Sequence, residues 1–368
     1  MDRIESVFSL KRGARVAIRL SSADVFIKGA EGDQARVIVL KRKPESILPV
    51  IEASEDELLI RSGEKKAGEE WDSKADRNLG RDLWDTIWGA VSSSLREVGI
   101  SLSVDIEKRV KDEVDLEILL PRGTILDFLT ASGDLTVQDW EGEILFRSSS
   151  GDCKLRNVKG EGKMRTSSGD VRVEDFEGPL SINSTSGDVN LDEIKGELRV
   201  ETVSGDVTLG KVKGDGSFSL ISGDLRVEEI EGQLKASTTS GDLQAKVINS
   251  PSLKVSTVSG DLSLSLIPVS GGKYELATTS GDIILRVPPS ARMEVKIATL
   301  SGSFFSNLNL SSEKVFEEKI DEGQKSGPIW LEKDWIRVGH KFTGVLNEKD
   351  AMLEIKTISG DITLRPLS

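Results

Sequence analysis

Cysteine and histidine each occur only once in this chain of 368 residues, as Cys153 and His340. A single cysteine excludes an intramolecular disulfide, and one cysteine with one histidine cannot supply the ligand cluster of a zinc site. A catalytic thiol needs a nearby histidine to activate it, and the one histidine, His340, lies in the irregular carboxy-terminal part. We therefore expect no metal site, no cofactor and no cysteine chemistry.

Long apolar runs are also missing. No stretch approaches the roughly 20 residues that a membrane-spanning helix requires. The amino terminus, Met1–Glu5, lacks the basic and apolar blocks of a signal peptide. These absences predict a soluble, cytoplasmic chain without a membrane span. The net charge of −13 argues against a nucleic-acid partner, which favours a basic surface.

The sequence contains none of the short motifs that mark common enzymes. A Gly-x-Ser-x-Gly elbow, a P-loop and a dinucleotide fingerprint are all absent. The chain has 62 acidic residues, but no pair of them stands out as the two carboxylates of a glycosidase. We therefore expect the protein not to be an enzyme.

Glycine is abundant, and it recurs in a strict repeat. The tripeptide Ser-Gly-Asp returns every 18 residues, starting at Ser132, Ser150, Ser168, Ser186, Ser204, Ser222 and Ser240. Looser copies follow at Ser259, Ser280 and Ser359, with a degenerate one at Ser301. A short fixed period of this kind is typical of a solenoid, in which each coil contacts only its neighbours.

The positions within the repeat define strands. Counted from the serine, positions 4, 6, 9, 13 and 15 are largely apolar, positions 5 and 7 are mostly polar, and position 11 is a second glycine. Alternation of this kind indicates strands with one buried face. The sequence therefore predicts an all-β fold, a single-stranded parallel β-helix or β-solenoid of 18-residue coils, with two sheets facing across a narrow core. Equivalent positions of successive coils should then lie about 4.8 Å apart.

Two other solenoids fit less well. A hexapeptide helix would require an apolar residue at every sixth position, but positions 10 and 16 are charged or polar. A calcium-binding β-roll would require Gly-Gly-x-Gly-x-Asp turns. Each turn here carries one aspartate, too few oxygens for the roughly 6–8 that calcium takes.

The regularity of the repeat divides the chain into three parts. Residues 1–123 are predicted to form irregular coils with a helical insertion at 63–99. Residues 124–302 form the regular solenoid, and 303–368 form irregular coils followed by a last repeat. The segment Ser22–Val25 is interpreted as a degenerate copy of the motif, with alanine in place of glycine.

The insertion is predicted to contain an amphipathic helix. Its apolar residues fall at three-and-four spacing: Leu83, Trp84, Ile87, Trp88, Val91, Leu95 and Val98. In one interpretation the helix covers an open end of the solenoid, since an uncovered edge strand invites aggregation. In the other, Trp84, Ile87, Trp88 and Val91 bind a protein partner or a second copy of the chain, because tryptophan is enriched at interfaces.

The Ser-Gly-Asp ladder also has two interpretations. As a structural element, each glycine supplies a positive φ and each aspartate accepts hydrogen bonds from turn amides. As a functional element, the aspartates form a row of cation ligands. The structural interpretation is favoured for this ladder, which comprises Gly133, Asp134, Gly151, Asp152, Gly169, Asp170, Gly187, Asp188, Gly205, Asp206, Gly223, Asp224, Gly241 and Asp242. Cys153 occupies the inward position 4, which predicts a buried thiol.

The repeated Ser-Gly-Asp-Val/Leu-x-Val/Leu, with Gly-x-Leu-x-Val between copies, resembles the putative-adhesin family of bacterial and archaeal β-strand-repeat proteins, a domain of unknown function. The resemblance implies a β-solenoid and an association with the cell surface, and it supplies no catalytic residues. The sequence thus favours a non-enzymatic, adhesin-like binding or scaffold protein of unknown ligand. A carbohydrate-active β-helix enzyme and a self-assembling structural protein are the alternatives.

Overall fold

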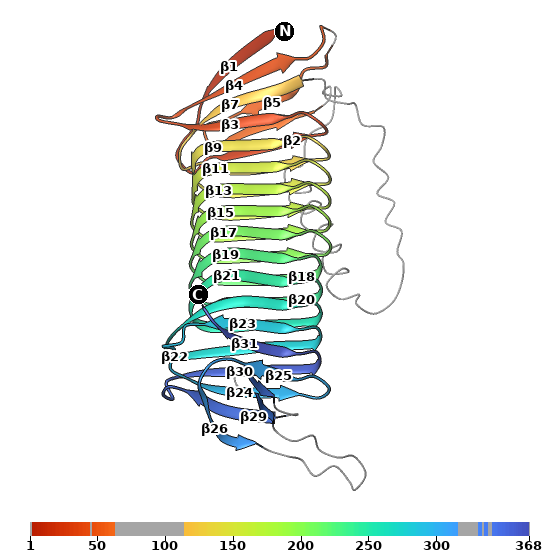
Figure 1. Ribbon diagram of the computed structural model, residues 1–368. Helices are drawn as coiled ribbons and strands as arrows, with labels where there is room; N and C mark the ends of the chain where they lie inside the picture. The colour runs from red at the N-terminus through yellow and green to blue at the C-terminus, as the bar shows by residue number, and fades with distance from the viewer. Residues whose placement is uncertain are drawn as a thin grey trace.

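The computed structural model describes residues 2–44, 46–62, 114–315, 330–332, 335–337 and 341–367. These residues form strands and connecting turns, and no helix occurs among them. Twenty-nine strands join into one sheet that coils around a narrow core, so the molecule is an elongated stack (Figure 1). The prediction of an all-β, mostly parallel fold is confirmed. The predicted helical insertion at 63–99 lies outside the described residues.

One face of the stack, which we call wall A, contains the strands that follow the Ser-Gly-Asp turns. In stacking order it comprises β7 (Val114–Pro121), β3 (Val25–Ala30), β9 (Leu135–Glu141), β11 (Cys153–Lys159), β13 (Val171–Glu177), β15 (Val189–Lys195), β17 (Val207–Lys213), β19 (Leu225–Glu231), the first halves of β21 (Leu243–Ser259) and β22 (Leu262–Ser280), β23 (Ile283–Val287), β31 (Ile362–Pro366) and β25 (Phe304–Ser306).

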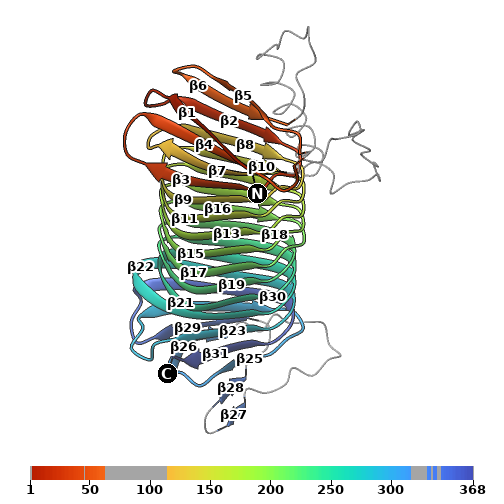
Figure 2. The same ribbon diagram turned by 90° about the horizontal axis from the view of Figure 1, so that it is seen from above.

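The opposite face, wall B, contains the strands that precede those turns. It comprises β6 (Glu57–Arg61), β2 (Arg15–Leu20), β8 (Ile125–Thr130), β10 (Ile144–Ser148), β12 (Gly162–Thr166), β14 (Leu180–Ser184), β16 (Leu198–Thr202), β18 (Gly216–Ser222), β20 (Leu234–Ser240), the second halves of β21 and β22, β30 (Ala351–Ser359) and β24 (Met293–Thr299). Figure 2 shows both walls of the stack.

The register follows the repeat. Leu135 pairs with Cys153, and Cys153 pairs with Val171, so partners in this part of wall A are 18 residues apart. Inward residues of both walls, such as Val173 and Ile182, are completely buried in one continuous hydrophobic core. Burial of this alternating face drives the stacking of the coils.

The first and the last coil along the chain are inserted into the stack, each one coil from its end. The coil of β2 and β3 lies between the coil of β6 and β7 and the coil of β8 and β9. The coil of β30 and β31 lies likewise between β22/β23 and β24/β25. Along the chain the last repeat follows the irregular segment 303–350, but in space it lies before the coil of β24 and β25. Order along the chain is not order in space here, because β24 and β25 leave a gap that the last coil fills.

Antiparallel strands are added at both ends of the stack. At the amino-terminal end, β4 (Gln34–Lys41) pairs with β7, β1 (Arg3–Ser9) pairs with β4, and β5 (Val50–Ala53) pairs with β6. At the other end, β29 (Lys341–Leu346) pairs with β24, and β26 (Leu310–Val315) pairs with β29. A separate two-stranded pair is formed by β27 (Trp330–Glu332) and β28 (Trp335–Arg337). Reversing the strand direction ends the parallel stacking, which limits edge-to-edge association.

Candidate functional site

The ladder aspartates are linked to one another by hydrogen bonds from coil to coil. The backbone N–H of each aspartate donates to Oδ1 of the aspartate in the preceding coil, as in Asp152 to Asp134 at 2.9 Å. The series runs through Asp24, Asp134, Asp152, Asp170, Asp188, Asp206, Asp224, Asp242, Asp261, Asp282 and Asp361 to the backbone of Ser303, at 2.8 to 3.1 Å. Each carboxylate therefore joins two neighbouring coils.

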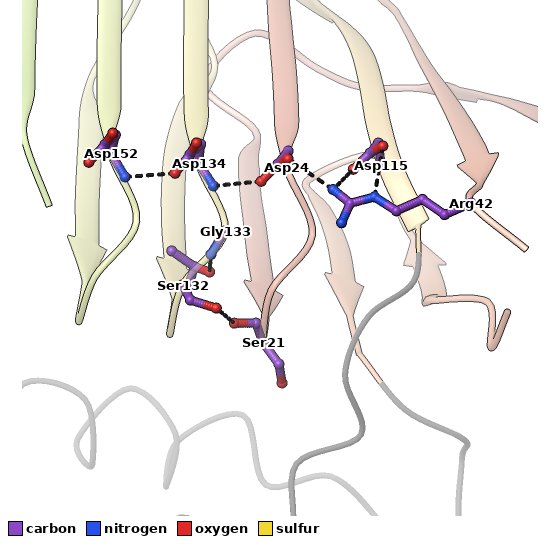
Figure 3. A network of polar contacts seen from close by, with 9 residues as sticks. Ser21, Asp24, Arg42, Asp115, Ser132, Gly133, Asp134 and Asp152 are labelled. Carbon is purple, nitrogen blue, oxygen red and sulfur yellow. Dashed lines mark hydrogen bonds and ion pairs between the residues drawn. The ribbon is translucent and has the colours of Figure 1, made fainter.

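An arginine ends this series at its amino-terminal side. Arg42 Nη2 donates to Asp24 Oδ2 at 2.9 Å and also to Asp115, while Arg42 Nε donates to Asp115 Oδ2 at 3.1 Å (Figure 3). The hydrogen bond to Asp115 is the main cause that raises the pKa of Arg42. The first carboxylate of the column is thus paired with a cation that directly follows β4.

Close approach between coils explains the glycines of the ladder. A Cβ placed on Gly187 would overlap the carbonyl oxygen of Gly169, and the same contact recurs with Gly169 over Gly151. Any side chain here would push neighbouring coils apart. The predicted positive φ occurs at only two of the seven regular copies, Gly223 and Gly241, at 144° and 153°. For the other five, the contact between coils is the reason for glycine.

The Ser-Gly-Asp turn changes its hydrogen bonding partway along the stack. In the earlier coils, the amide of the ladder glycine donates to the hydroxyl three residues before it, as from Gly205 to Thr202 Oγ1 at 3.1 Å. Leu220 stands at the equivalent position before Gly223 and offers no hydroxyl. The amide of Gly223 donates instead to the carbonyl of Ser240 in the next coil, at 3.2 Å.

A second change occurs at the opposite corner of the same coil, residues 204–221. At repeat position 8 the four preceding coils hold a non-glycine residue with positive φ: Asp139, Asn157, Asp175 and Glu193, at 53° to 55°. The equivalent residue of the coil 204–221, Lys211, is not among the described residues with positive φ. The regular array is therefore interrupted at both corners of one coil.

A groove of about 770 Å³ opens on the outer face of wall A at this interruption. Gly210 replaces the larger side chain that other coils carry at position 7, and the carboxylate of Asp192 lies over it. Asn190 and Thr208, which pair across β15 and β17, also line the groove. Asp192 Oδ1 accepts the backbone amides of Glu193 at 3.1 Å and Lys211 at 3.3 Å.

Ion pairs border the groove. Glu174 accepts hydrogen bonds from Arg156 at 2.6 Å and Arg172 at 2.7 Å, and these bonds lower its pKa. On the other side Lys246 donates to Glu228 at 2.7 Å. The groove is thus lined by charges of both signs around a hydrogen-bonding floor.

The same coil is also hollowed on wall B. A smaller cavity of about 280 Å³ is lined by Gly216, Ser217 and the neighbouring Lys235, among others. The ring of Phe218 would meet a Cβ at Gly216, so the core aromatic and the small residue fit together. The coil 204–221 therefore carries a hollow on each of its two outer faces.

A buried aspartate lies elsewhere on wall B. Asp127 points away from the core yet has no exposed surface, because arginines from neighbouring strands cover it. Arg15 and Arg19 of β2 donate to its Oδ2, the latter at 2.6 Å, and Arg147 of β10 donates to its Oδ1 at 2.7 Å. Burial alone would raise its pKa, but the charges of Arg19 and Arg147 and the hydrogen bonds outweigh burial and lower it to about 2.

The remaining predicted site residues divide into two groups. The proposed partner-binding residues Trp84, Ile87, Trp88 and Val91, and also His340, lie outside the described residues. Cys153 is buried, and burial raises the pKa of its thiol far above the usual range. A thiol in this state is unreactive near neutral pH.

Sequence reasoning missed both the groove and the Asp127 cluster. The sequence does mark Gly210, since it is the one glycine at position 7 of the seven regular coils. The sequence also marks Leu220, which is an apolar residue at a repeat position otherwise held by serine or threonine. Asp127 has no such mark, because Arg15 and Arg19 approach it from more than 100 residues away.

Metal ligands do not gather in the part of the chain that the structure describes, where no group of three or more His, Cys, Asp or Glu side chains could hold an ion. Among the residues that the structure describes, no helix has the length and hydropathy that a membrane span requires.

Comparison with known proteins gives a family match. The sequence matches the family described as Toastrack DUF4097 over residues 14–220 and again over 211–329. A search among curated proteins found no match. Two solved structures are similar at 10% identity: a putative cell adhesion protein from Clostridium sporogenes, covering 100% of both chains with a TM-score of 0.17, and a putative adhesin from Bacteroides fragilis, covering 100% of this chain and 97% of the other with a TM-score of 0.23.

Proposed function

The chain belongs to the Toastrack DUF4097 family, and from this premise we propose that it is a non-enzymatic, adhesin-like binding protein. The groove at Gly210 is its proposed binding site. It is lined by residues of five successive strands of wall A, from β13 to β21. At about 4.8 Å per strand, it accommodates an extended segment of roughly 19 Å along the axis of the stack.

The lining of the groove favours a polar ligand. Asn190 and Thr208 supply neutral donors and acceptors, while Lys211 and Glu229 supply charges of opposite sign. None of the described residues that line the groove is aromatic, so stacking on a ring is not what they offer a ligand. Hydrogen bonding along an extended polar chain, such as a glycan or a hydrophilic peptide segment, is the interaction that these residues support.

Two acidic residues of the groove, Glu174 and Asp192, do not suit general acid catalysis. A general acid at neutral pH needs a pKa raised toward the operating pH. The pKa of Glu174 is lowered instead, by hydrogen bonds from Arg156 and Arg172. Asp192 is occupied by two backbone amides. This supports binding over the alternative of a carbohydrate-active enzyme.

End-to-end self-assembly is also disfavoured by the described strands. Both ends of the stack carry antiparallel strands, β4 and β1 at one end and β29 and β26 at the other. A filament built by continuing the parallel stack would have to displace them. The protein is therefore proposed to act as a discrete unit and not as a polymer subunit.

Thr208→Arg tests the groove, because a long charged side chain at this position would fill its floor. Thr136→Arg is the matched control, since Thr136 occupies the same repeat position in β9, outside the groove. Binding of the labelled protein is measured to a panel of immobilised neutral polysaccharides, acidic polysaccharides and gelatin. We expect at least one surface to bind the wild type and Thr136→Arg equally, and Thr208→Arg at least tenfold more weakly. If no surface binds, or if both variants bind alike, the proposal is wrong.

A further inference from the structure

A row of arginines crosses the outer face of wall B near its amino-terminal end. Arg61 of β6 pairs with Arg19 of β2, which pairs in turn with Leu129 of β8. On the other side of Leu129, Arg147 of β10 follows, and it pairs with Arg165 of β12. Their neighbours on each strand, such as Ile18 and Phe128, are buried in the core, so these five side chains point outward. We call these four arginines the arginine row.

Positive charge exceeds negative charge on these five strands. They carry six cations, Arg15, Arg19, Arg61, Arg147, Lys163 and Arg165, but only two carboxylates, Glu57 and Asp127. Two acids beside the strands also take part, since Glu52 lies 3.7 Å from Arg61 and Glu161 lies 2.5 Å from Lys163. Cations therefore outnumber carboxylates on these five described strands, in a chain whose net charge is −13.

The buried aspartate does not use up the arginines around it. Three guanidinium groups share the single negative charge of Asp127, and each has five N–H donors. In addition, Nε of Arg61 is buried and has no hydrogen-bond partner among the described residues. Asp127 thus holds Arg19 and Arg147 in fixed positions and leaves donors and positive charge for a second anion. Planar guanidinium groups held in this way suit carboxylate and phosphate groups.

The surroundings of the row favour a hydrophilic ligand. The outward residues of the following wall B strands include hydroxyl and amide side chains, Ser181 and Asn183 on β14 and Ser217 and Ser219 on β18. None of the large apolar side chains exposed among the described residues lies on wall B between β6 and β20. A protein partner would be expected to bury large exposed apolar anchors, and the outward apolar side chains here, Leu129 and Leu145, are partly covered.

We propose that the arginine row is a binding site for a short acidic polysaccharide segment, with its carboxylate or phosphate groups on the arginines and its hydroxyl groups on the adjacent serines and Asn183. The row spans four strand spacings, or about 19 Å. Acidic residues elsewhere on the protein disfavour a longer polyanion. The site lies on the opposite wall from the Gly210 groove, so each can be tested without the other.

The test uses polygalacturonate as the carboxylate probe, dextran phosphate as the phosphate probe, and neutral dextran and polyglutamate for comparison, at low and at physiological salt. Lys163→Ser and Arg165→Ser remove charge from β12 without touching the Asp127 cluster. We expect each variant to weaken binding of dextran phosphate or polygalacturonate three- to tenfold. The double variant should weaken it at least tenfold. Lys235→Ser, on β20 of the same wall, is the matched control and should bind like the wild type.

Binding to polygalacturonate alone, dextran phosphate alone or both supports the proposal and identifies the anionic group. Thr208→Arg should leave this binding unchanged, which separates the arginine row from the groove. The proposal fails if neither acidic polysaccharide binds at low salt, if neutral dextran binds equally well, or if polyglutamate binds more tightly than both. It also fails if the β12 variants, with unchanged thermal unfolding, bind like the wild type. If Arg165→Ser unfolds, Lys163→Ser alone decides the outcome.

Discussion

Arg19 holds Asp127 at two points, with Nη1 donating to its backbone carbonyl and Nη2 to its carboxylate, each at 2.6 Å. The two residues are 108 positions apart, and their strands β2 and β8 are neighbours only because the first coil is inserted into the stack. Arg147 binds the same carboxylate from the other side. One buried charge therefore links three successive strands of wall B and fixes the position of the inserted coil.

Asp127→Asn should destabilise the amino-terminal coils. The substitution removes the charge that three arginines share, and breaking a buried ion pair costs about 3–5 kcal/mol. The arginines keep some contact with water, so we expect a loss of about 3 kcal/mol, with faster hydrogen exchange in β2, β8 and β10 than in β18 and β20. Asp56→Asn, at an exposed aspartate, is the control and should change little. Equal stability of the two variants would show that the buried charge does not hold the coils.

The same aspartate predicts an acid-sensitive contribution to stability. Its pKa is about 2 in the folded protein, below the ordinary 3.8. A lowered pKa stabilises the folded state fully above pH 3.8, and this contribution disappears as the pH falls through 2. It amounts to roughly 2 kcal/mol. The stability difference between wild type and Asp127→Asn should therefore shrink by about this amount from pH 5 to pH 2, as measured by denaturant unfolding. A difference independent of pH would contradict the assignment.

Much of this fold could be predicted from periodicity. The spacing of Ser-Gly-Asp and the alternation around Val171 and Val173 indicate stacked parallel strands, because both follow from local geometry and burial. The inserted first and last coils could not be predicted in this way. Their positions depend on which strand edges are left open, and contacts such as Arg19 with Asp127 join distant segments without a local signal. The groove at Gly210 could be predicted in part, since one glycine at an otherwise polar repeat position marks it.

Gly187→Ala tests whether contact between coils, and not φ, requires glycine in the ladder. The new Cβ would overlap the carbonyl oxygen of Gly169, so the coils must separate. Overpacking in a core typically costs about 1–3 kcal/mol, and a clash with backbone should lie at the upper end of that range or above it. Gly32→Ala is the comparison, because Gly32 has open space around it but a φ of 100°. We expect it to cost about 1–2 kcal/mol. A smaller loss at Gly187 than at Gly32 in urea unfolding would reverse the explanation.

Glu193→Gly should stabilise the protein. Glu193 has a φ of 55°, where the equivalent residues of the preceding coils are Asp139, Asn157 and Asp175. Aspartate and asparagine tolerate this conformation better than glutamate, and glycine adopts it freely. We expect a gain of about 0.5–1 kcal/mol in the free energy of unfolding, partly offset by the flexibility of glycine in the unfolded chain. Glu229→Gly, at the same repeat position but without positive φ, should lower stability. Two losses would indicate that strain at position 8 is negligible.

Thr238→Val and Thr202→Val form a matched pair that tests the change of turn geometry at Leu220. Both threonines occupy repeat position 17 and are buried. Thr202 Oγ1 accepts the amide of Gly205, so valine would leave a buried N–H without a partner, at a cost of about 1–3 kcal/mol.

Thr238 Oγ1 has no hydrogen-bond partner within the described part of the chain, because the amide of Gly241 donates to the carbonyl of Ser259. Replacing this hydroxyl by a methyl group of similar shape should be neutral or stabilise by up to about 1 kcal/mol. Urea unfolding of the two variants gives the comparison directly. If Leu220 separates two kinds of turn, the two variants should change the free energy of unfolding in opposite directions or by clearly different amounts. An equal loss at both positions would mean that Thr238 makes the same hydrogen bond as Thr202, and that one turn geometry runs through the whole stack.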